Sequence, residues 1–433
     1  MMMCVAGGAG SGMKGGCGPC PTSLLPLLLI VAAALLGARG AGGGSRHHQG
    51  DPSAIGHPRR GPRSEPKDID ARVRSLLEKV PLIDGHNDLP WNIRSYLRNH
   101  LRGFRFTEDL RQFKPWSHSV WSHTDLYRLQ QGMVGAQFWS AYAPCSSQYL
   151  DSVQLTLEQI DVIRRLVARY PQHMEFVTSA DGIMEAHRSR RLASLIGVEG
   201  GHAISTSLAV LRVLYRLGAR YLTLTHTCST PWADCSTVDA PGQIPDHNGL
   251  TDFGKTVVLE MNRLGMMVDL SHASVRTMLD VLETTRAPVI FSHSAAHALC
   301  NSSRNVPDHV LRLVAQNGGI VMVAFYNYFV SCNDTASIRD VLAHINHIRD
   351  VAGADHGLED VSGYPRLFGE LLASPRWNEL DVQKLAGLNL LRVMRQVEKV
   401  RDEMRAAGVT PSEESIPAEY LYGKNYCRFS ETL

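Results

Sequence analysis

Short apolar runs alternate along the chain with stretches whose apolar residues recur every three or four positions. The runs are typical of buried strands and the stretches of amphipathic helices. This alternation indicates an α/β protein whose parallel strands are joined by crossover helices. We predict seven strands, over 80–83, 134–139, 193–198, 221–225, 266–270, 288–291 and 319–325. Helices are predicted between them, for example over 155–170, 208–217, 253–264 and 275–284.

Polar and acidic residues follow most of the predicted strands, which favours a TIM-like (β/α)8 barrel, because barrel active sites gather where the strands end. A doubly wound sheet usually carries a Gly-rich phosphate-binding turn after its first strand, and the sequence has none there. An eighth strand should separate the predicted helices 337–351 and 358–372, but the join around 354–356 has no apolar run. We therefore predict a barrel in which the eighth strand segment is deleted. A natural seven-stranded barrel is the alternative.

The N-terminal region predicts secretion. An apolar stretch at 23–36 follows Lys14 and is too short for a comfortable membrane span. Small residues suited to signal cleavage come next, although an attached signal anchor is the alternative. The C-terminus has no polar spacer and apolar tail, so no lipid-anchor signal is predicted. We divide the chain into a signal peptide and leader (1–41), a flexible segment rich in Gly, Pro, Arg and Ser (42–68), the barrel (69–427) and a short tail (428–433).

Composition and charge narrow the classes of function. The chain of 433 residues has a formal net charge of +2 and no long run of one sign, which argues against a nucleic-acid partner. The glycosylation sequons at Asn301 and Asn333 each directly follow a cysteine, which indicates exposed loops of a secreted protein. Six cysteines outside the leader suit an oxidising compartment, but their spacing does not fix a connectivity: Cys145, Cys228, Cys235, Cys300, Cys332 and Cys427.

Five residues near the ends of predicted strands have the chemistry of zinc ligands. His86 and Asp88 follow the first strand two residues apart, so they would point the same way in an extended chain. Glu199 follows the third strand, His272 the fifth and His293 the sixth. These imidazoles and carboxylates suffice for two zinc ions, with Glu199 as the bridge. The alternative is that the histidines only form hydrogen bonds in a wet barrel mouth.

Other polar residues are weaker candidates. His226, after the fourth strand, could be a ligand or a donor to an oxyanion, and Arg304 could bind a substrate carboxylate through two hydrogen bonds. His344 and His347 lie one helical turn apart, and we expect them on a solvated helix face. Nucleophilic catalysis is disfavoured because no strained turn or base accompanies the candidate nucleophiles Ser271, Ser292 and Cys235.

Long motifs spread over about residues 70–427 resemble the vertebrate membrane (renal) dipeptidase family, which consists of zinc-dependent barrel metallohydrolases. The resemblance rests on Asp84-Gly-His-Asn-Asp-Leu-Pro90, Gly135-Ala-Gln-Phe-Trp139, Gly197-Val-Glu-Gly-Gly-His202, Tyr221-Leu-Thr-Leu-Thr-His226, Asn262-Arg-Leu-Gly-Met-Met-Val-Asp-Leu-Ser-His272, Ala287-Pro-Val-Ile-Phe-Ser-His293 and Arg304-Asn-Val-Pro-Asp308. Motifs of this length and order make the resemblance specific.

The resemblance implies a function and a site. The family hydrolyses dipeptides, including cysteinyl-glycine and leukotriene D4, and some β-lactams, and its members are held at the cell surface by a lipid (GPI) anchor. One zinc ion would be bound by His86, Asp88 and Glu199, and the other by Glu199, His272 and His293. His226 would act in catalysis and contact substrate together with Arg304. Disulfides would join Cys145 to Cys228 and Cys300 to Cys332, and Cys427 would link a homodimer, with no role implied for Cys235.

The sequence departs from the family pattern in two places. The family carries Gly-Gly-Asp-x-Asp-Gly on its last strand, and the first aspartate binds the substrate amine and handles the leaving-group proton. Here the chain passes from Ala354 almost directly to Gly357 without that segment, and it also lacks a lipid-anchor signal. The alternative function is therefore a catalytically impaired, secreted or cell-surface binding protein. Another barrel amidohydrolase is disfavoured, because that broader group commonly has His-x-His on its first strand, where this chain has His86-Asn-Asp88.

Overall fold

The structure is a computed structural model that describes residues 66–352, 362–421 and 424. The predicted signal peptide and leader, residues 42–65, the join at 354–356, Cys427 and the tail 428–433 lie outside the described residues. The first described element is helix α1 (Pro66–Lys79). In the part of the chain described, no helix has the length and apolar character needed to cross a bilayer.

The centre of the fold is a parallel sheet that follows the chain order. All seven predicted strands are present, and each pairs in parallel with the next along the path β1-β2-β4-β5-β6-β7-β8. One further strand, β3 (Met174–Phe176), pairs with β4 beside this path and was not predicted. The strands of the path are β1 (Leu82–Asn87), β2 (Val134–Tyr142), β4 (Leu192–Glu199), β5 (Ala219–Thr223), β6 (Met267–Asp269), β7 (Ile290–Ser294) and β8 (Ile320–Val323).

The barrel is nearly closed, with a seam between its first and last strands. Among the described residues, no strand pairs with the outer edge of β1 or of β8, as expected for a barrel without its eighth strand. Side chains fill this seam instead. Met322 of β8 lies against Gly85 of β1, where an added Cβ atom would be only 2.4 Å from Met322 Cε. The π-helical segment Lys384–Leu388 also packs on the start of β1, because a Cβ atom at Gly387 would lie 2.2 Å from the carbonyl oxygen of Pro81.

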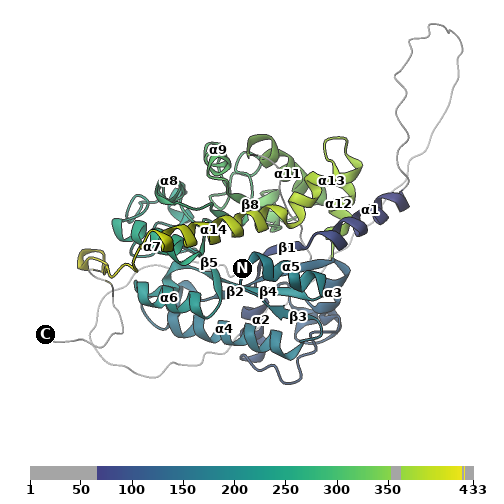
Figure 1. Ribbon diagram of the computed structural model, residues 1–433, viewed down its shortest axis with the longest axis horizontal. Helices are drawn as coiled ribbons and strands as arrows, with labels where there is room; N and C mark the ends of the chain where they lie inside the picture. Colours follow the sequence, from purple (N-terminus) through teal and green to yellow (C-terminus); the bar gives the residue numbers. More distant parts are fainter. Residues whose placement is uncertain (1–65, 353–361, 422–423, 425–433) are drawn as a thin grey trace, which may run out of the picture. The chain divides into compact units, whose positions relative to one another are not determined.

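The inside of the barrel is apolar near the beginnings of the strands. Inward side chains from most strands form one buried cluster there, including Ile83, Ala136, Ala193, Met267, Ile290 and Ile320. The long helix α14 (Asn389–Ala406) packs seven buried apolar residues, such as Leu391 and Val397, into the same cluster. Helix α14 (yellow-green in Figure 1) therefore covers the amino ends of the strands. The carboxyl ends are left for polar residues.

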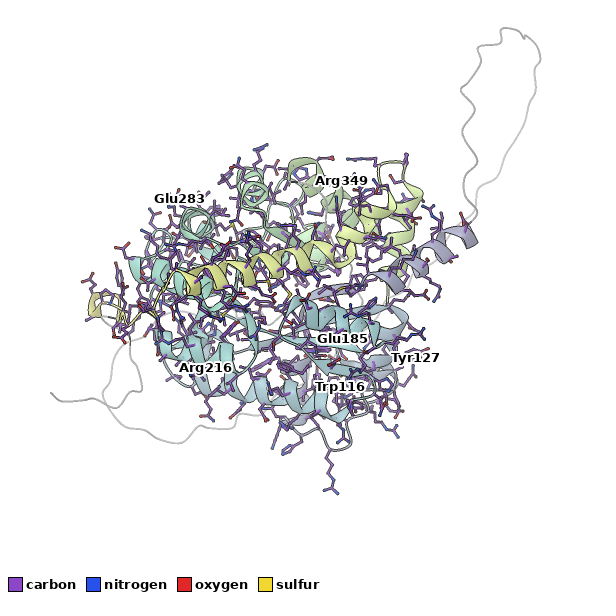
Figure 2. All side chains as sticks on the ribbon, in the orientation of Figure 1. Trp116, Tyr127, Glu185, Arg216, Glu283 and Arg349 are labelled. Atoms are coloured by element: carbon purple, nitrogen blue, oxygen red, sulfur yellow. A yellow bond between two sulfur atoms is a disulfide. The ribbon has the colours of Figure 1, made fainter. Side chains whose placement is uncertain are left out.

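A layer of helices surrounds the sheet, and the predicted helices are confirmed. Their apolar faces pack on the strands, while charged residues such as Arg216 on α6 and Glu283 on α8 are exposed and point outward (Figure 2). The longer helices are α4 (Ser152–Arg169), α7 (Asp252–Leu264), α8 (Val275–Thr284), α9 (Asp308–Asn317), α11 (Ile338–Ala352) and α12 (Tyr364–Ala373). The shorter ones are α2 (Leu89–Leu97), α3 (Leu126–Gln131), α5 (Ala180–Arg188), α6 (Leu208–Arg216), α10 (Asn327–Val330) and α13 (Glu379–Gln383).

The expectation of a solvated helix face at His344 is wrong. This side chain is buried on α11 and links two other segments. Its Nδ1 accepts a hydrogen bond from the backbone N–H of Ala296 at 3.0 Å, and its Nε2 donates to the carbonyl oxygen of Val330 at 2.8 Å. His347 pairs with Asp308 at 2.8 Å. The spacing of His344 and His347 could not show which side of α11 is buried, because both sides of the helix carry polar residues.

Two disulfides join loops in the part of the chain that the structure describes. They join Cys145 to Cys228 and Cys300 to Cys332. Within the described ranges Cys235 is a free, buried cysteine. The two glycosylation candidates, Asn301 and Asn333, are exposed next to the second disulfide. The first disulfide is close to the strand ends, since Cys145 Sγ is 3.8 Å from Nδ1 of His226.

Candidate active site

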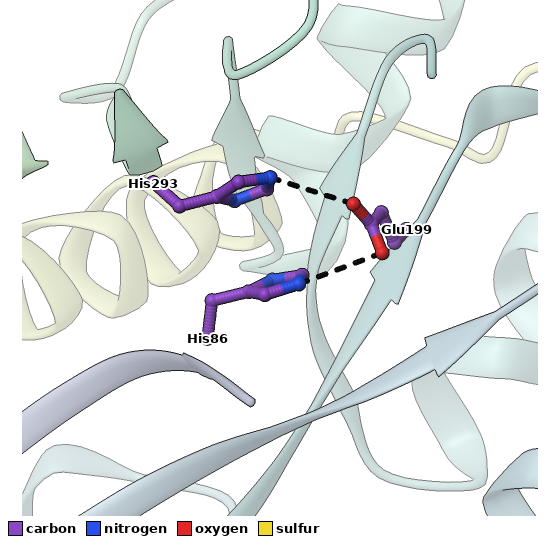
Figure 3. Close-up of side chains that lie close together, drawn as sticks. All are labelled: His86, Glu199 and His293. Atoms are coloured by element: carbon purple, nitrogen blue, oxygen red, sulfur yellow. Dashed lines mark ion pairs between the residues drawn. The ribbon is translucent and has the colours of Figure 1, made fainter. Parts of the chain in front are cut away.

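A buried carboxylate lies at the centre of the strand ends. Glu199 is the last residue of β4, is 4% exposed, and accepts a hydrogen bond from the Ser140 hydroxyl of β2 at 3.1 Å. Four imidazoles converge on its two oxygens through their Nε2 atoms: His272 at 3.3 Å, His293 at 3.4 Å and His226 at 3.6 Å from Oε1, and His86 at 3.5 Å from Oε2. Figure 3 shows His86 and His293 facing different oxygens of Glu199.

The parallel sheet explains why residues so distant in sequence meet. His86 lies near the end of β1, His293 lies in β7, and His226 and His272 follow the ends of β5 and β6. Because parallel strands all end at the same mouth of a barrel, these side chains reach one place. The structure thus brings four predicted site histidines to the predicted bridging carboxylate.

The orientation of His86 is set by a tyrosine. The Tyr221 hydroxyl on β5 donates to the carbonyl oxygen of Gly85 at 3.1 Å. A hydroxyl has one hydrogen, so Tyr221 must accept from His86 Nδ1, which lies 3.1 Å away. This places the hydrogen of a neutral His86 on Nδ1 and directs the Nε2 lone pair at Glu199. Such outer partners commonly orient histidines that bind metals.

The orientation of His293 is set by a serine and a buried aspartate. Ser292 Oγ donates to Asp269 Oδ2 at 2.6 Å and lies 2.8 Å from His293 Nδ1, from which it must accept. Asp269 is fully buried at the end of β6. It also accepts from the Thr223 hydroxyl and from the backbone N–H groups of Ser271 and Ser292. The Nε2 lone pair of a neutral His293 is therefore also directed inward.

Charges in the site are strongly coupled. Burial alone would raise the pKa of Glu199, but the charge on His86 and the contacts with His272 and His293 hold the pKa well below its usual value. Burial tends to lower the pKa of His86, yet the carboxylates of Glu199 and Asp88 raise it to about 9. Desolvation lowers the pKa of His293 to about 4 and holds that of His272 well below its ordinary value. Without a metal, one protonated imidazole thus faces Glu199 beside neutral ones.

The donor groups fit a metal centre. Two sets of possible ligand atoms each lie within 4.8 Å of one another, one from His86, Glu199 and His293 and the other from Glu199, His226 and His272. Nε2 of His272 and Nε2 of His293 are 3.1 Å apart. At this distance the two nitrogens can share one proton or bind one cation. Imidazole nitrogens with one carboxylate are typical zinc ligands.

Residues 70–408 match the membrane dipeptidase family, peptidase family M19. The chain belongs to this family. It is 49% identical to dipeptidase 3 of Macaca fascicularis and 48% identical to dipeptidase 3 of Homo sapiens, in each case over 82% of this chain and 72% of the relative. The chain is therefore a metallo-dipeptidase by family, and its candidate metal residues are those around Glu199.

Solved structures support the fold of this dipeptidase. The probable dipeptidase PvdM from Pseudomonas aeruginosa superposes with a TM-score of 0.66 at 17% identity, over 78% of this chain and 100% of that one. A metallopeptidase from Rhodobacter sphaeroides, liganded with a phosphinate mimic of the dipeptide L-Ala-D-Ala, gives 0.63 at 23% identity, over 74% and 99%. At these identities the likeness shows the shared fold.

Asp88 lies at the rim of the dipeptidase site. Its side chain is 62% exposed, and its Oδ1 is 3.2 Å from Nε2 of His86. It belongs to neither of the two ligand sets around Glu199, whereas His226 belongs to one of them. The division of ligands between two ions, with Asp88 as one of them, therefore stays a prediction.

Arg304 supplies a buried positive charge beside the dipeptidase site. Its Nη2 donates to the carbonyl oxygen of His293 at 3.1 Å, and its guanidinium lies over the Phe329 ring at 5.0 Å. Among the described residues, its Nε has no hydrogen-bond partner. Burial lowers its pKa to about 10, partly opposed by Glu199 and Asp269, so it remains charged near neutral pH. This geometry suits a ligand carboxylate.

Sequence reasoning did not assign roles to the residues that orient the histidines, above all Asp269 and Tyr221. Both lie within the motifs that carry the resemblance, but inside strands, where a polar residue at an inward position was the available signal. Ser292 was considered only as a nucleophile and rejected in that role. Its contacts with Asp269 and His293 give it an orienting role instead.

Proposed function

We propose that this dipeptidase hydrolyses dipeptides with two zinc ions held around Glu199. The observation that carries the proposal is the convergence of four imidazole Nε2 atoms on one buried carboxylate. When bound, zinc supplies a Lewis acid for the scissile carbonyl and activates a water molecule as the nucleophile. Glu199 bridges the ions in this proposal, and the family resemblance points to cysteinyl-glycine, leukotriene D4 and some β-lactams as substrates.

The residues around the metals would bind and polarise the substrate. Arg304 would pair with the C-terminal carboxylate of the dipeptide through its buried guanidinium, which would limit substrate length. The ring of His226 stacks on His272, with centroids 4.2 Å apart, and its Nδ1 lies 3.1 Å from the Thr227 hydroxyl. If that hydroxyl donates to Nδ1, a neutral His226 carries its hydrogen on Nε2. This N–H is the donor that a developing oxyanion needs.

A second function is favoured by one observation. The sequence lacks the last-strand aspartate that the family uses for the leaving-group proton, and the barrel seam has no strand pairing there among the described residues. A metal-loaded protein without turnover would then act as a secreted or cell-surface binding protein. Secretion, glycosylation at Asn301 and Asn333, and a homodimer linked through Cys427 belong to the same proposal and rest on the sequence.

The test compares purified native protein with a version in which a Gly-Gly-Asp-containing strand is restored after Ala354. Zinc is quantified in both, and hydrolysis of a simple dipeptide is followed with and without a chelator. We expect about two zinc ions per chain and chelator-sensitive turnover by the native protein. Turnover by the restored version alone would favour the binding function. No zinc and no turnover in either would contradict both functions.

A further inference from the structure

A tyrosine that follows the strands in sequence reaches β1 at the seam between β1 and β8. Tyr364 is the first residue of α12 and is buried. Its hydroxyl donates to Asp84 Oδ2 at 2.9 Å, and its ring meets Phe325 edge to face, with centroids 6.1 Å apart. The apolar face of α12, formed by residues such as Leu367 and Phe368, packs in the main core. The helix therefore holds Tyr364 in place independently of β1.

Asp84 connects Tyr364 to the candidate metal site. Its second oxygen, Oδ1, accepts the backbone N–H of His86 at 3.0 Å. A single carboxylate thus joins the Tyr364 hydroxyl to the backbone of a predicted zinc ligand. This link matters because β1 pairs with β2 on one edge only, within the described ranges. Tyr221 orients the His86 ring, whereas Asp84 fixes the backbone that carries it.

We propose that Tyr364 is a positioning residue for the metal site: its hydroxyl crosses the seam and, through Asp84, fixes the end of β1 that carries His86. The inference rests on the proposed function in so far as His86 binds zinc. Packing alone does not explain the hydroxyl, because phenylalanine would fill nearly the same volume. Residues that orient a metal ligand typically change metal affinity by about 10–100-fold when they are replaced.

The test measures zinc affinity by chelator competition for the native protein, Tyr364→Phe and a matched control, Tyr96→Phe. The Tyr96 hydroxyl on α2 donates to Ser119 Oγ at 2.7 Å in a partly buried site, so the control also removes one hydrogen-bonded hydroxyl. We expect Tyr364→Phe to weaken zinc binding about tenfold and Tyr96→Phe to leave it unchanged. In an Asp84→Asn background, the effect of Tyr364→Phe should fall below about twofold, because the two residues act in series.

A second measurement does not depend on zinc. In the metal-free protein, hydrogen exchange of the His86 amide should be faster in Tyr364→Phe than in native protein and unchanged in Tyr96→Phe. Unchanged exchange and unchanged zinc affinity would overturn the inference. So would a lower melting temperature of Tyr364→Phe without a change at His86 or in zinc affinity, since that pattern marks a packing role. If the native protein did not bind zinc, the proposed function would be overturned. Faster exchange of the His86 amide in Tyr364→Phe would still show that Tyr364 fixes the end of β1.

Discussion

The two sides of Glu199 are built differently. His293 stands on β7, which pairs with a strand on each edge, and its ring is oriented by Asp269, a carboxylate that accepts four hydrogen bonds. His86 stands on β1, which pairs on one edge among the described residues and is held by the side chains of Tyr221 and Asp84. Strand pairing on both edges thus fixes the β7 side of the site. On the β1 side, side-chain hydrogen bonds take the place of the missing strand pairing.

The largest effect is expected where the two halves meet. Glu199→Ala removes the shared carboxylate and leaves four imidazoles facing one another. Metal catalysis supplies several kcal/mol, so we expect dipeptide hydrolysis to fall about a thousandfold or more. A steady-state assay on folded, zinc-treated protein measures this. A variant that kept a tenth of the native rate would contradict the proposal that Glu199 holds the metal ions on both sides of the site.

Arg304→Lys tests whether the β7 side also binds substrate. Lysine keeps the charge but loses the planar group that gives two parallel hydrogen bonds. A charge-assisted hydrogen bond contributes about 1.5–3 kcal/mol, so we expect KM for a dipeptide to rise about 10–100-fold, with a smaller change in kcat. A dipeptide amide, which lacks the terminal carboxylate, should show little difference between the native and Arg304→Lys proteins. An equal loss with both substrates would contradict carboxylate binding.

Ser292→Ala breaks the chain of hydrogen bonds from Asp269 to His293 on the β7 side of the site. The Ser292 hydroxyl connects Asp269 to His293, so its removal frees the imidazole to rotate. We expect zinc affinity to fall about tenfold, as measured by chelator competition. Ser331→Ala is the control, because within the described ranges its hydroxyl bonds only to backbone groups around α10. If both variants bind zinc as tightly as the native protein, the chain of hydrogen bonds does not orient His293.

A pH dependence of stability is expected on the β1 side. The folded-state pKa of His86 is raised to about 9, above its ordinary value of 6.5. The resulting stabilisation of the metal-free protein is fully present below pH 6.5 and is lost as the pH rises through about 9. We expect the free energy of unfolding to fall by on the order of 2–3 kcal/mol over this range. Denaturant titrations with a chelator measure it. Zinc-loaded protein, in which His86 is neutral, should not show this loss, and an equal loss would contradict the assignment.

The sequence predicted what depends on local pattern. The seven strands of the path are short apolar runs bounded by polar residues, and the site histidines lie at or shortly after the ends of four of them. Strand β3 was missed because its three residues carry too little pattern. The tyrosine contact with Asp84 joins positions 280 residues apart and depends on how the chain closes the seam, which no local pattern records. His344 was misplaced for the same reason, since its partners come from other segments.

The most direct test of the central claim is a stepwise zinc titration of the metal-free native protein, with bound zinc counted at each step. With His86 and His293 on different ions, as the family resemblance implies, the account predicts two binding steps of unequal affinity, the weaker one on the β1 side. Tyr364→Phe should weaken that step, and Ser292→Ala should weaken the tighter one. A single step, no binding, or two steps unaffected by either variant would contradict a two-ion site whose halves are supported differently.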